Sequence, residues 1–259
     1  MKKGYALITG ASGGIGKQLA YHFAKDGYSL VLVARSKQKL EELKRELEDN
    51  YSISVLISIK DLSKQEEALK LYDEIKQQRI TVEFLVNNAG FGLYGTFIET
   101  SWSEEADMID LNIKMLTYLT KLFLPEMVER NEGRILNIAS VAAFLPGPLM
   151  AVYYATKAYV LSFTEALENE LKDTNVTISA LCPGPTKTGF SDRANLSSSK
   201  LFESGALRVE DVAKTGYEQF MKGKTVIIPG AKFKVATMLP RFLPRKLITK
   251  VVRSMQEVK

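Results

Sequence analysis

TGASGGIG at residues 9–16 continues directly from the apolar run YALIT at residues 5–9. Its glycines have the spacing G-x-x-x-G-x-G, which differs from the dinucleotide fingerprint G-x-G-x-x-G. The physics is shared, because a tight glycine turn lets the backbone approach a pyrophosphate at a helix N-terminus. An ordinary glycine-rich turn is the alternative. The apolar strand before the turn and the amphipathic helix after it favour dinucleotide binding.

Seven apolar runs predict the strands of a sheet. They are nearly continuous rather than alternating with polar residues, as expected for parallel strands that are buried on both faces. The expected strands are residues 5–9, 29–34, 54–58, 84–87, 134–139, 177–182 and 225–229.

Amphipathic patterns between these runs predict helices. Residues 36–50 place their leucines on one face, and Ser36 is the expected cap. Residues 61–78 repeat the pattern after an expected cap at Ser63. This alternation predicts an α/β fold of the Rossmann type, a doubly wound, seven-stranded parallel sheet with helices on both faces.

The end of the second predicted strand indicates which dinucleotide the chain binds. An acid there binds the ribose 2′-hydroxyl of NAD, whereas an arginine accommodates the 2′-phosphate of NADP. The chain reads VLVARS at residues 31–36, so Ala34 stands in the place of the acid and Arg35 follows it. The charge and planar donors of arginine suit a phosphate, and Ser12 adds a hydroxyl. A solvated arginine at the head of a helix is the alternative, and we predict NADP.

The composition is that of a globular α/β protein, with 259 residues, 46% hydrophobic and 25% charged. The formal net charge of +5 is unevenly spread. Residues 222–259 contain ten Lys or Arg and one acid, so the basic character belongs to the C-terminal tail.

Several classes of site are disfavoured by the rarity of cysteine and histidine. Cys182 and His22 are the only residues of their kinds, which argues against a Cys/His zinc site and a Ser-His-Asp triad. The apolar run near the start is too short for a signal peptide, and no segment reaches the about eighteen apolar residues of a membrane span. We expect no metal and, with no internal disulfide available, a cytoplasmic protein.

Tyr153 and Lys157 lie four residues apart in the helical stretch YYATKAYV, and therefore on one face. An ammonium beside a phenol lowers the pKa of tyrosine from its usual value of about 10. Such a phenol exchanges protons with a substrate oxygen near neutral pH. Ser140, at the end of a predicted strand, is expected to hydrogen-bond the same oxygen. In isolation, the Tyr–Lys pair would indicate only an amphipathic helix.

Six motifs in order resemble those of the short-chain dehydrogenase/reductase family. The resemblance runs from about residue 4 to residue 190 and continues loosely to the end. Each motif alone is weak to moderate, but all six occur at the expected strand end or helix. They are TGASGGIG, NNAG at residues 87–90, Asn112, Ser140, the pair Tyr153 and Lys157, and Pro183–Gly184.

This resemblance implies catalytic roles. Tyr153 is the general acid that protonates a carbonyl oxygen as NADPH delivers hydride to the carbon. Lys157 lowers the tyrosine pKa and holds the nicotinamide ribose, and Ser140 orients the substrate oxygen. Asn112 anchors a water that relays protons to Lys157; a buried, internally satisfied Asn112 is the alternative. Tyr154 is expected to turn away from the face of Tyr153.

The resemblance also implies the contacts of NADP. Asp61 and Leu62 meet the adenine, although Asp61 could simply begin a helix. Asn87 lies beside the cofactor, and the residues after the sixth strand lie along the nicotinamide. These positions fall at the carboxyl ends of strands, where open α/β sheets bind ligands. The expected cofactor-binding residues are Gly10, Ser12, Gly14, Ile15, Gly16, Arg35, Asp61, Leu62, Asn87, Tyr153, Lys157, Pro183, Gly184, Thr186 and Thr188.

Residues 231–259 are expected to form a basic, amphipathic extension packed on a single catalytic domain of residues 1–230. Apolar residues recur there at helical spacing, and Pro244 suits the first turn of a final helix. Three interpretations are open: a helix that packs on its own domain or a partner subunit, a helix on an anionic membrane surface, and a nucleic-acid patch. The scarcity of aromatic residues disfavours nucleic acid.

The expected substrate is a small hydrophobic carbonyl compound, because apolar residues are expected to line the pocket. Residues 187–206 are polar and predict a long loop beside it. The tail is similar to that of relatives that reduce steroid or long-chain acyl ketones. The expected apolar wall is Leu93, Tyr94, Phe144, Leu145 and Met150.

Two alternatives to an NADP-dependent reductase remain. One is a non-catalytic NADP(H)-binding protein, which would not need the set of Ser140, Tyr153, Lys157 and Asn112. The other is a membrane-surface interaction protein. The resemblance implies a homo-oligomer, which we expect to be a dimer, although the tail departs from the short, glycine-rich ending of many tetrameric relatives.

Overall fold

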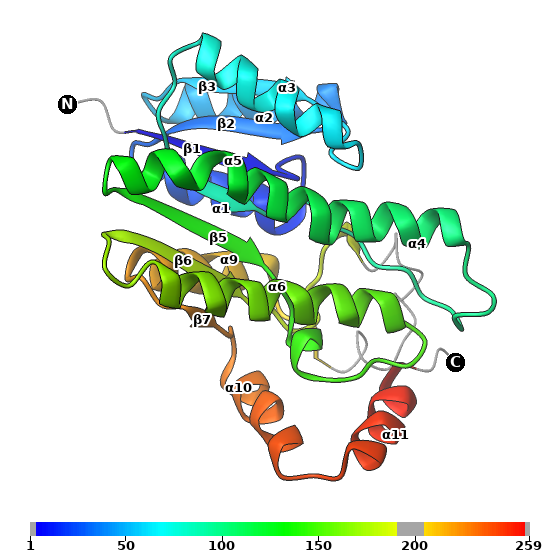
Figure 1. The fold of residues 1–259 in the computed structure, drawn as a ribbon. Coiled ribbons are helices and arrows are strands. Elements are labelled where there is room, and N and C mark those ends of the chain that lie inside the picture. The colour runs from blue at the N-terminus through cyan, green and yellow to red at the C-terminus, as the bar shows by residue number, and fades with distance from the viewer. Residues whose placement is uncertain (1–3, 191–204, 257–259) are drawn as a thin grey trace.

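A computed structural model describes residues 4–190 and 205–256 of the chain. Its seven strands form one parallel sheet in the order β3-β2-β1-β4-β5-β6-β7 (Figure 1). The strands are β1 (Tyr5–Thr9), β2 (Ser29–Ala34), β3 (Val55–Ile59), β4 (Val82–Asn87), β5 (Gly133–Ile138), β6 (Val176–Leu181) and β7 (Val226–Ile227).

The predicted doubly wound sheet is confirmed. The first six strands begin and end within two residues of the expected bounds. The seventh is shorter than expected and pairs only with β6, at Val226 and Ile227. Pro229 follows closely and has no amide hydrogen to donate to a ladder, which accounts for the early end of the strand.

Helices cover both faces of the sheet (Figure 1). One layer packs on the core around Phe23, Phe84 and Phe220, and the other on the core around Leu85 and Phe123. Burying each such side chain contributes about 1.5–3 kcal/mol to folding. The first layer is α1 (Gly14–Lys25), α2 (Lys37–Asn50) and α9 (Val209–Met221). The second is α3 (Gln65–Gln77), α5 (Leu116–Glu129) and α6 (Ala151–Glu170), with α4 (Trp102–Ile109) joined to α5 by the π-helix η1 (Asp110–Met115).

The two expected helix caps differ from the structure. Ser36 occupies the N-cap position of α2, but its side chain makes no capping hydrogen bond. Helix α3 begins at Gln65 with Lys64 at its N-cap, so the expected cap at Ser63 is wrong. The hydroxyl of Ser63 donates instead to Asp61 Oδ1 at 2.9 Å. Asp61 thereby organises a local turn before the helix, which takes the hydroxyl away from capping.

The chain reverses its direction across the sheet between β1 and β4. At such a switch point, the loops at the carboxyl ends of the two strands diverge and leave a crevice for a ligand. The glycine turn after β1, with Gly10 at φ 65°, opens onto this crevice.

The C-terminal segment leaves the edge of the sheet after β7 and forms an arch. It consists of α10 (Ala231–Met238), the short 3-10 helix η3 (Leu239–Arg241) and α11 (Arg245–Gln256), which turns back toward the carboxyl ends of the strands (Figure 1). Ile248 and Val252 pack against Ala142, Met150 and Tyr154, so this face of the tail packs on its own domain.

Among the described residues, no helix combines the length and apolarity needed to cross a bilayer. Most of the segment 187–206, expected as a long loop, lies outside the described residues.

Candidate functional site

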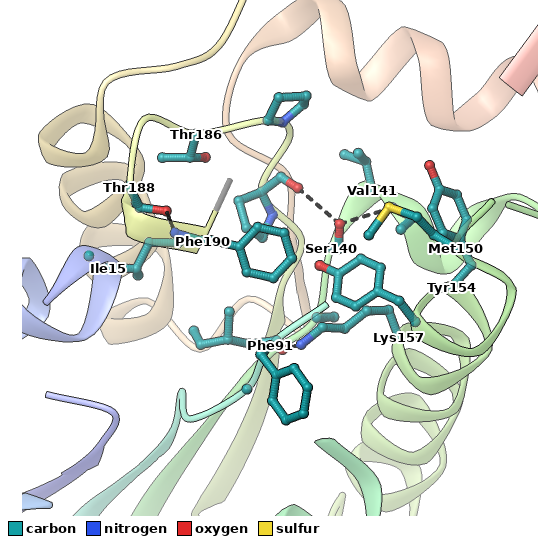
Figure 2. A pocket seen from close by; sticks show the side chains of 18 of the residues that line it. Ile15, Phe91, Ser140, Val141, Met150, Tyr154, Lys157, Thr186, Thr188 and Phe190 are labelled. Carbon is teal, nitrogen blue, oxygen red and sulfur yellow. Dashed lines mark hydrogen bonds between the residues drawn. The ribbon is translucent and has the colours of Figure 1, made fainter. Parts of the chain in front are cut away.

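A cavity of about 920 Å³ runs along the carboxyl ends of the strands, from the glycine turn to the tail. Figure 2 shows side chains from its walls converging on it from several elements. It brings together most of the residues expected from the sequence. These are Gly10, Ser12, Gly14, Ile15, Arg35, Asp61, Leu62, Ser140, Tyr153, Lys157, Pro183, Gly184, Thr186 and Thr188.

The glycine turn has the properties of an anion cradle. Gly13 is the N-cap of α1, no side chain caps the helix, and no acid lies in its first turn. The first backbone amides of the helix are therefore not occupied by a capping side chain and present positive partial charge. A Cβ added to Gly13 would meet nothing within 4 Å, so space exists above the turn. These features fit the pyrophosphate of a dinucleotide.

Gly16 lies outside the cavity wall, and its lack of a side chain makes room for Asn88 rather than for a ligand. A Cβ at this position would meet Asn88 Nδ2 at 2.5 Å and the Gly10 carbonyl oxygen at 2.7 Å. Asn88 Nδ2 donates to the carbonyl oxygens of Thr9, at 2.8 Å, and Gly10, at 3.2 Å. Gly16 therefore lets the side chain of Asn88 reach the turn and hold its shape.

Cations and one acid surround the other end of the dinucleotide crevice. Arg35 and Lys39 line it, and both are exposed. Burial alone would raise the pKa of Asp61, but hydrogen bonds from Ser63 and the charge of Arg35 outweigh it and hold that pKa below its ordinary value. The sequence analysis did not name Lys39. Its position four residues after Arg35, in the first turns of α2, is the signal that could have identified it.

Ser140, Tyr153 and Lys157 come together at the carboxyl end of β5 and the start of α6. Lys157 is 6% exposed, and its Nζ donates to the carbonyl oxygen of Ile138 at 2.8 Å. This Nζ lies 5.7 Å from the ring centroid of Tyr153. The Ser140 hydroxyl accepts from the Ala142 amide at 3.1 Å, and Figure 2 shows its side chain next to Val141. A catalytic group of this composition can bind and protonate a carbonyl oxygen.

The charges in this cluster depart from the expectation that Lys157 lowers the pKa of Tyr153. Burial raises the pKa of Tyr153 above its ordinary value, and the polar contact with Ser140 only partly opposes that rise. Burial also lowers the pKa of Lys157 to about 8. The lysine ammonium bonds to a backbone carbonyl rather than to the phenol, so desolvation is the dominant effect on both groups.

Asn112 is buried in the π-helix η1 and lies outside the cavity wall. Its Nδ2 donates to the Phe91 carbonyl oxygen at 2.9 Å and to Thr156 Oγ1 at 3.1 Å. Its Oδ1 accepts from the Phe91 amide at 3.1 Å. The hydrogen bonds of the Asn112 side chain are thus made within the protein, as in the alternative interpretation of a buried, internally satisfied residue. It fastens the segment after β4 to α6, one residue from Lys157.

The structure places Asn87 in the core rather than in the cavity wall. Its Nδ2 donates to Thr120 Oγ1 at 3.1 Å and to Asn137 Oδ1 at 2.9 Å. Asn88, its neighbour, lines the cavity. Because successive side chains of a strand point to opposite faces, only one of two adjacent asparagines can face the crevice.

The substrate end of the cavity is apolar and differs in part from the expected wall. Leu145 and Met150 line it, whereas Leu93, Tyr94 and Phe144 do not. Phe190 was not expected there, and its ring lies 5.4 Å from that of Tyr153. The tail supplies further apolar lining residues, namely Phe233, Ala236, Leu239, Pro240, Leu243, Leu247, Ile248, Val251, Val252 and Met255.

Tyr154 does not turn away from the site. It lines the cavity, and its hydroxyl accepts a hydrogen bond from Gln256 Nε2 of α11 (Tyr154 is labelled in Figure 2). The apolar stripe of the tail was visible in the sequence. Its docking position beside Tyr154 was not, because periodicity defines a face without defining its partner.

Comparison with known proteins shows the family to which the chain belongs. The model of the short chain dehydrogenases matches residues 4–198. An uncharacterized oxidoreductase of Staphylococcus saprophyticus is 36% identical over 186 residues, which are 72% of this chain and 80% of the relative. A very-long-chain 3-oxoacyl-CoA reductase of Anas platyrhynchos is 34% identical over 69% of this chain, but the match spans only 58% of that relative's length.

Two solved structures share the fold and hold dinucleotides. A short-chain dehydrogenase of Sphingobium yanoikuyae in complex with NADPH is 30% identical, with a TM-score of 0.83 over 92% of this chain and 94% of the other. A short-chain dehydrogenase/reductase of Burkholderia phymatum in complex with NAD is 26% identical, with a TM-score of 0.84 over 100% of this chain and 98% of the other. The chain therefore belongs to the short-chain dehydrogenase/reductase family of oxidoreductases, which act on alcohol and carbonyl groups.

Proposed function

We propose that the chain is an NADPH-dependent reductase of hydrophobic ketones, able to oxidise the corresponding secondary alcohols in reverse. One observation carries the proposal: a single cavity joins the glycine turn and Arg35 to Ser140, Tyr153 and Lys157. A dinucleotide and a carbonyl compound would therefore share one cavity.

In this mechanism the glycine turn and Arg35 would hold NADPH, and the bound cofactor would supply a hydride for the carbonyl carbon. Ser140 binds the carbonyl oxygen through its hydroxyl and fixes its direction. Tyr153 donates its proton to the same oxygen. Burial raises the pKa of Tyr153, so the phenol carries the proton that it would donate at neutral pH. The raised pKa also makes the phenol a weaker acid than a group whose pKa matches the operating pH. Lys157 lies one turn along α6 and places its ammonium group near the ring of Tyr153. Asn112 is a positioning residue, because it bonds to Thr156 of the same helix.

The preference for NADP over NAD rests on Arg35, Lys39 and Ser12. All three line the crevice, and they offer two cations and a hydroxyl to a 2′-phosphate. The NADPH complex of the Sphingobium relative is consistent with this preference, whereas the Burkholderia relative is in complex with NAD.

The preference for a hydrophobic substrate rests on the apolar wall of Leu145, Met150, Phe190 and α11. Such a wall suits an acyl chain or a steroid-like ring system and disfavours a sugar. The very-long-chain 3-oxoacyl-CoA reductase among the relatives is in accord with this class of substrate.

We further propose peripheral contact between the tail and an anionic membrane surface. Val235 and Met238 are exposed on α10, and Phe242, directly after η3, is 81% exposed. Lysines and arginines accompany them, including Lys246 and Lys250. Exposed apolar side chains with adjacent cations are what an anionic bilayer binds. The cytoplasmic location of the protein remains a prediction. The homodimer is also a prediction, and light scattering during gel filtration would measure the mass of the assembly.

The test is NADPH oxidation over a panel of ketones of increasing chain length. Tyr153→Phe removes the proton donor and is expected to lower kcat by about 10²–10⁴-fold. Tyr159→Phe is the matched control, because it makes the same change on the same helix at an exposed residue outside the cavity. Full activity in Tyr153→Phe would overturn the mechanism. Inactivity over the whole panel, together with tight NADPH binding, would favour a non-catalytic NADPH-binding protein.

A further inference from the structure

The carboxamide of Gln256 is a buried polar group in an otherwise apolar wall. Gln256 is 1% exposed, lies at the end of α11 and lines the cavity. Its Nε2 donates to the hydroxyl of Tyr154, whereas its Oε1 has no hydrogen-bond partner. A buried acceptor without a donor is unfavourable, and a ligand group that donated to this oxygen would remove that cost.

The surroundings of Gln256 make it a distinct feature of that wall. Among the described tail residues that line the cavity, Gln256 and Thr237 are the ones with polar side chains. The hydroxyl of Thr237 donates to the carbonyl oxygen of Lys234 at 2.9 Å and is thereby satisfied. Gln256 is therefore the tail residue with unused hydrogen-bonding capacity at the substrate end.

Tyr154 completes the arrangement. Its hydroxyl accepts the bond from Gln256 and so retains its own proton for donation. Burial raises the pKa of Tyr154 to about 12, with the Gln256 bond opposing it, and the phenol stays protonated. Its ring packs edge-on against that of Tyr153, with centroids 6.1 Å apart. The Gln256 acceptor and the Tyr154 donor thus lie side by side, and Tyr154 is in ring contact with Tyr153, the proposed proton donor.

We propose that Gln256 and Tyr154 form a polar subsite for a hydroxyl group carried by the substrate at a distance from its carbonyl. A hydroxyl matches the pair because it donates to Gln256 Oε1 and accepts the proton of Tyr154. The substrate class is then a hydrophobic hydroxyketone, with its apolar body between the two polar ends. This inference rests on the proposed function, since the carbonyl is taken to bind at Tyr153.

The experiment compares unbranched methyl ketones with their omega-hydroxy counterparts over a range of chain lengths. For the wild type, we expect kcat/KM with NADPH to favour the hydroxyketone by about tenfold at the chain length that reaches Gln256, the factor typical of one hydrogen bond. Gln256→Leu and Tyr154→Phe each remove one member of the pair and should abolish that preference. Gln77→Leu, the same change at an exposed position of α3, should retain it.

Thermal shift with the same ligand pairs provides a readout that does not depend on turnover. The hydroxyketone should raise the Tm of the wild type more than the plain ketone does, and the difference should vanish in Gln256→Leu. If no ketone is reduced but this difference appears, the proposed reaction fails and the subsite stands. If ketones are reduced with equal kcat/KM for both members of every pair, the subsite is overturned and the reaction stands.

Discussion

Lys157 donates a hydrogen bond from its ammonium group to the main-chain carbonyl oxygen of Ile138, the last residue of β5, at 2.8 Å. A cation is thereby held in the protein interior by an uncharged partner. The position of Lys157 costs folding free energy, because a carbonyl oxygen compensates only part of the hydration that the ammonium loses.

Replacing Lys157 with Met should therefore stabilise the protein while destroying its activity. The pKa of Lys157 is lowered from 10.5 to about 8 in the folded chain, so the unfolded chain binds more protons between these values. The wild type gains stability as the pH rises through this window. At neutral pH, Lys157→Met should raise the free energy of unfolding by about 1–3 kcal/mol, and the gain should shrink toward pH 10.

Urea denaturation at neutral and alkaline pH measures this difference. Lys172→Met, which removes an exposed lysine just after α6, should change the free energy of unfolding little at either pH. A Lys157→Met protein that is less stable than the wild type at neutral pH would contradict the account of this lysine.

Replacing Arg35 with Asp should change which dinucleotide the protein prefers. The substitution removes a charge-assisted contact to a 2′-phosphate and adds a carboxylate that repels it. We expect kcat/KM for NADPH to fall by about 10–100-fold while that for NADH changes much less. Arg45→Asp makes the same charge change at an exposed position of α2 and serves as the control. A wild type that already prefers NADH would refute the assignment of Arg35.

Alanine substitutions at two glycines of the turn should affect different properties, namely stability at Gly16 and NADPH binding at Gly13. In Gly16→Ala the new Cβ would lie 2.5 Å from Asn88 Nδ2 and 2.7 Å from the Gly10 carbonyl oxygen. Such overpacking should cost about 1–3 kcal/mol of stability. In Gly13→Ala the backbone is extended and the Cβ meets no atom, so the Tm should hold while the Kd for NADPH rises. Differential scanning calorimetry and fluorescence titration separate the two effects, and a destabilised Gly13→Ala protein would contradict this division.

Vesicle binding tests the membrane contact of the tail. The full chain should co-sediment with vesicles that contain phosphatidylserine, and less so as salt screens the lysines and arginines. Phe242→Asp should weaken binding by about tenfold, because it removes an aromatic side chain that the bilayer would bury. Phe97→Asp alters a residue that is 63% exposed elsewhere on the surface and is the control. Equal binding by Phe242→Asp and the wild type would exclude this contact.

The strands and the glycine turn were predictable because their signals are local. An apolar run such as residues 29–34 reports its burial on both faces without knowledge of its neighbours. The cluster of Ser140, Tyr153 and Lys157 was predictable because two of its members share one helix face.

The remaining features depend on contacts between distant segments. Nothing near Tyr154 in the sequence indicates that Gln256, 102 residues later, bonds to it. The choice between Asn87 and Asn88 depends on which face of β4 meets the crevice. The pKa of Lys157 depends on burial, which a sequence spacing does not report.

The arch of α10, η3 and α11 gathers much of the apolar cavity wall into one continuous stretch of the chain. In the proposed mechanism, dinucleotide binding and proton transfer would use residues up to Thr188, whereas much of the apolar cavity wall comes from the stretch after Gly230. Exchanging that stretch between relatives would alter the selected ketone without touching the reacting groups.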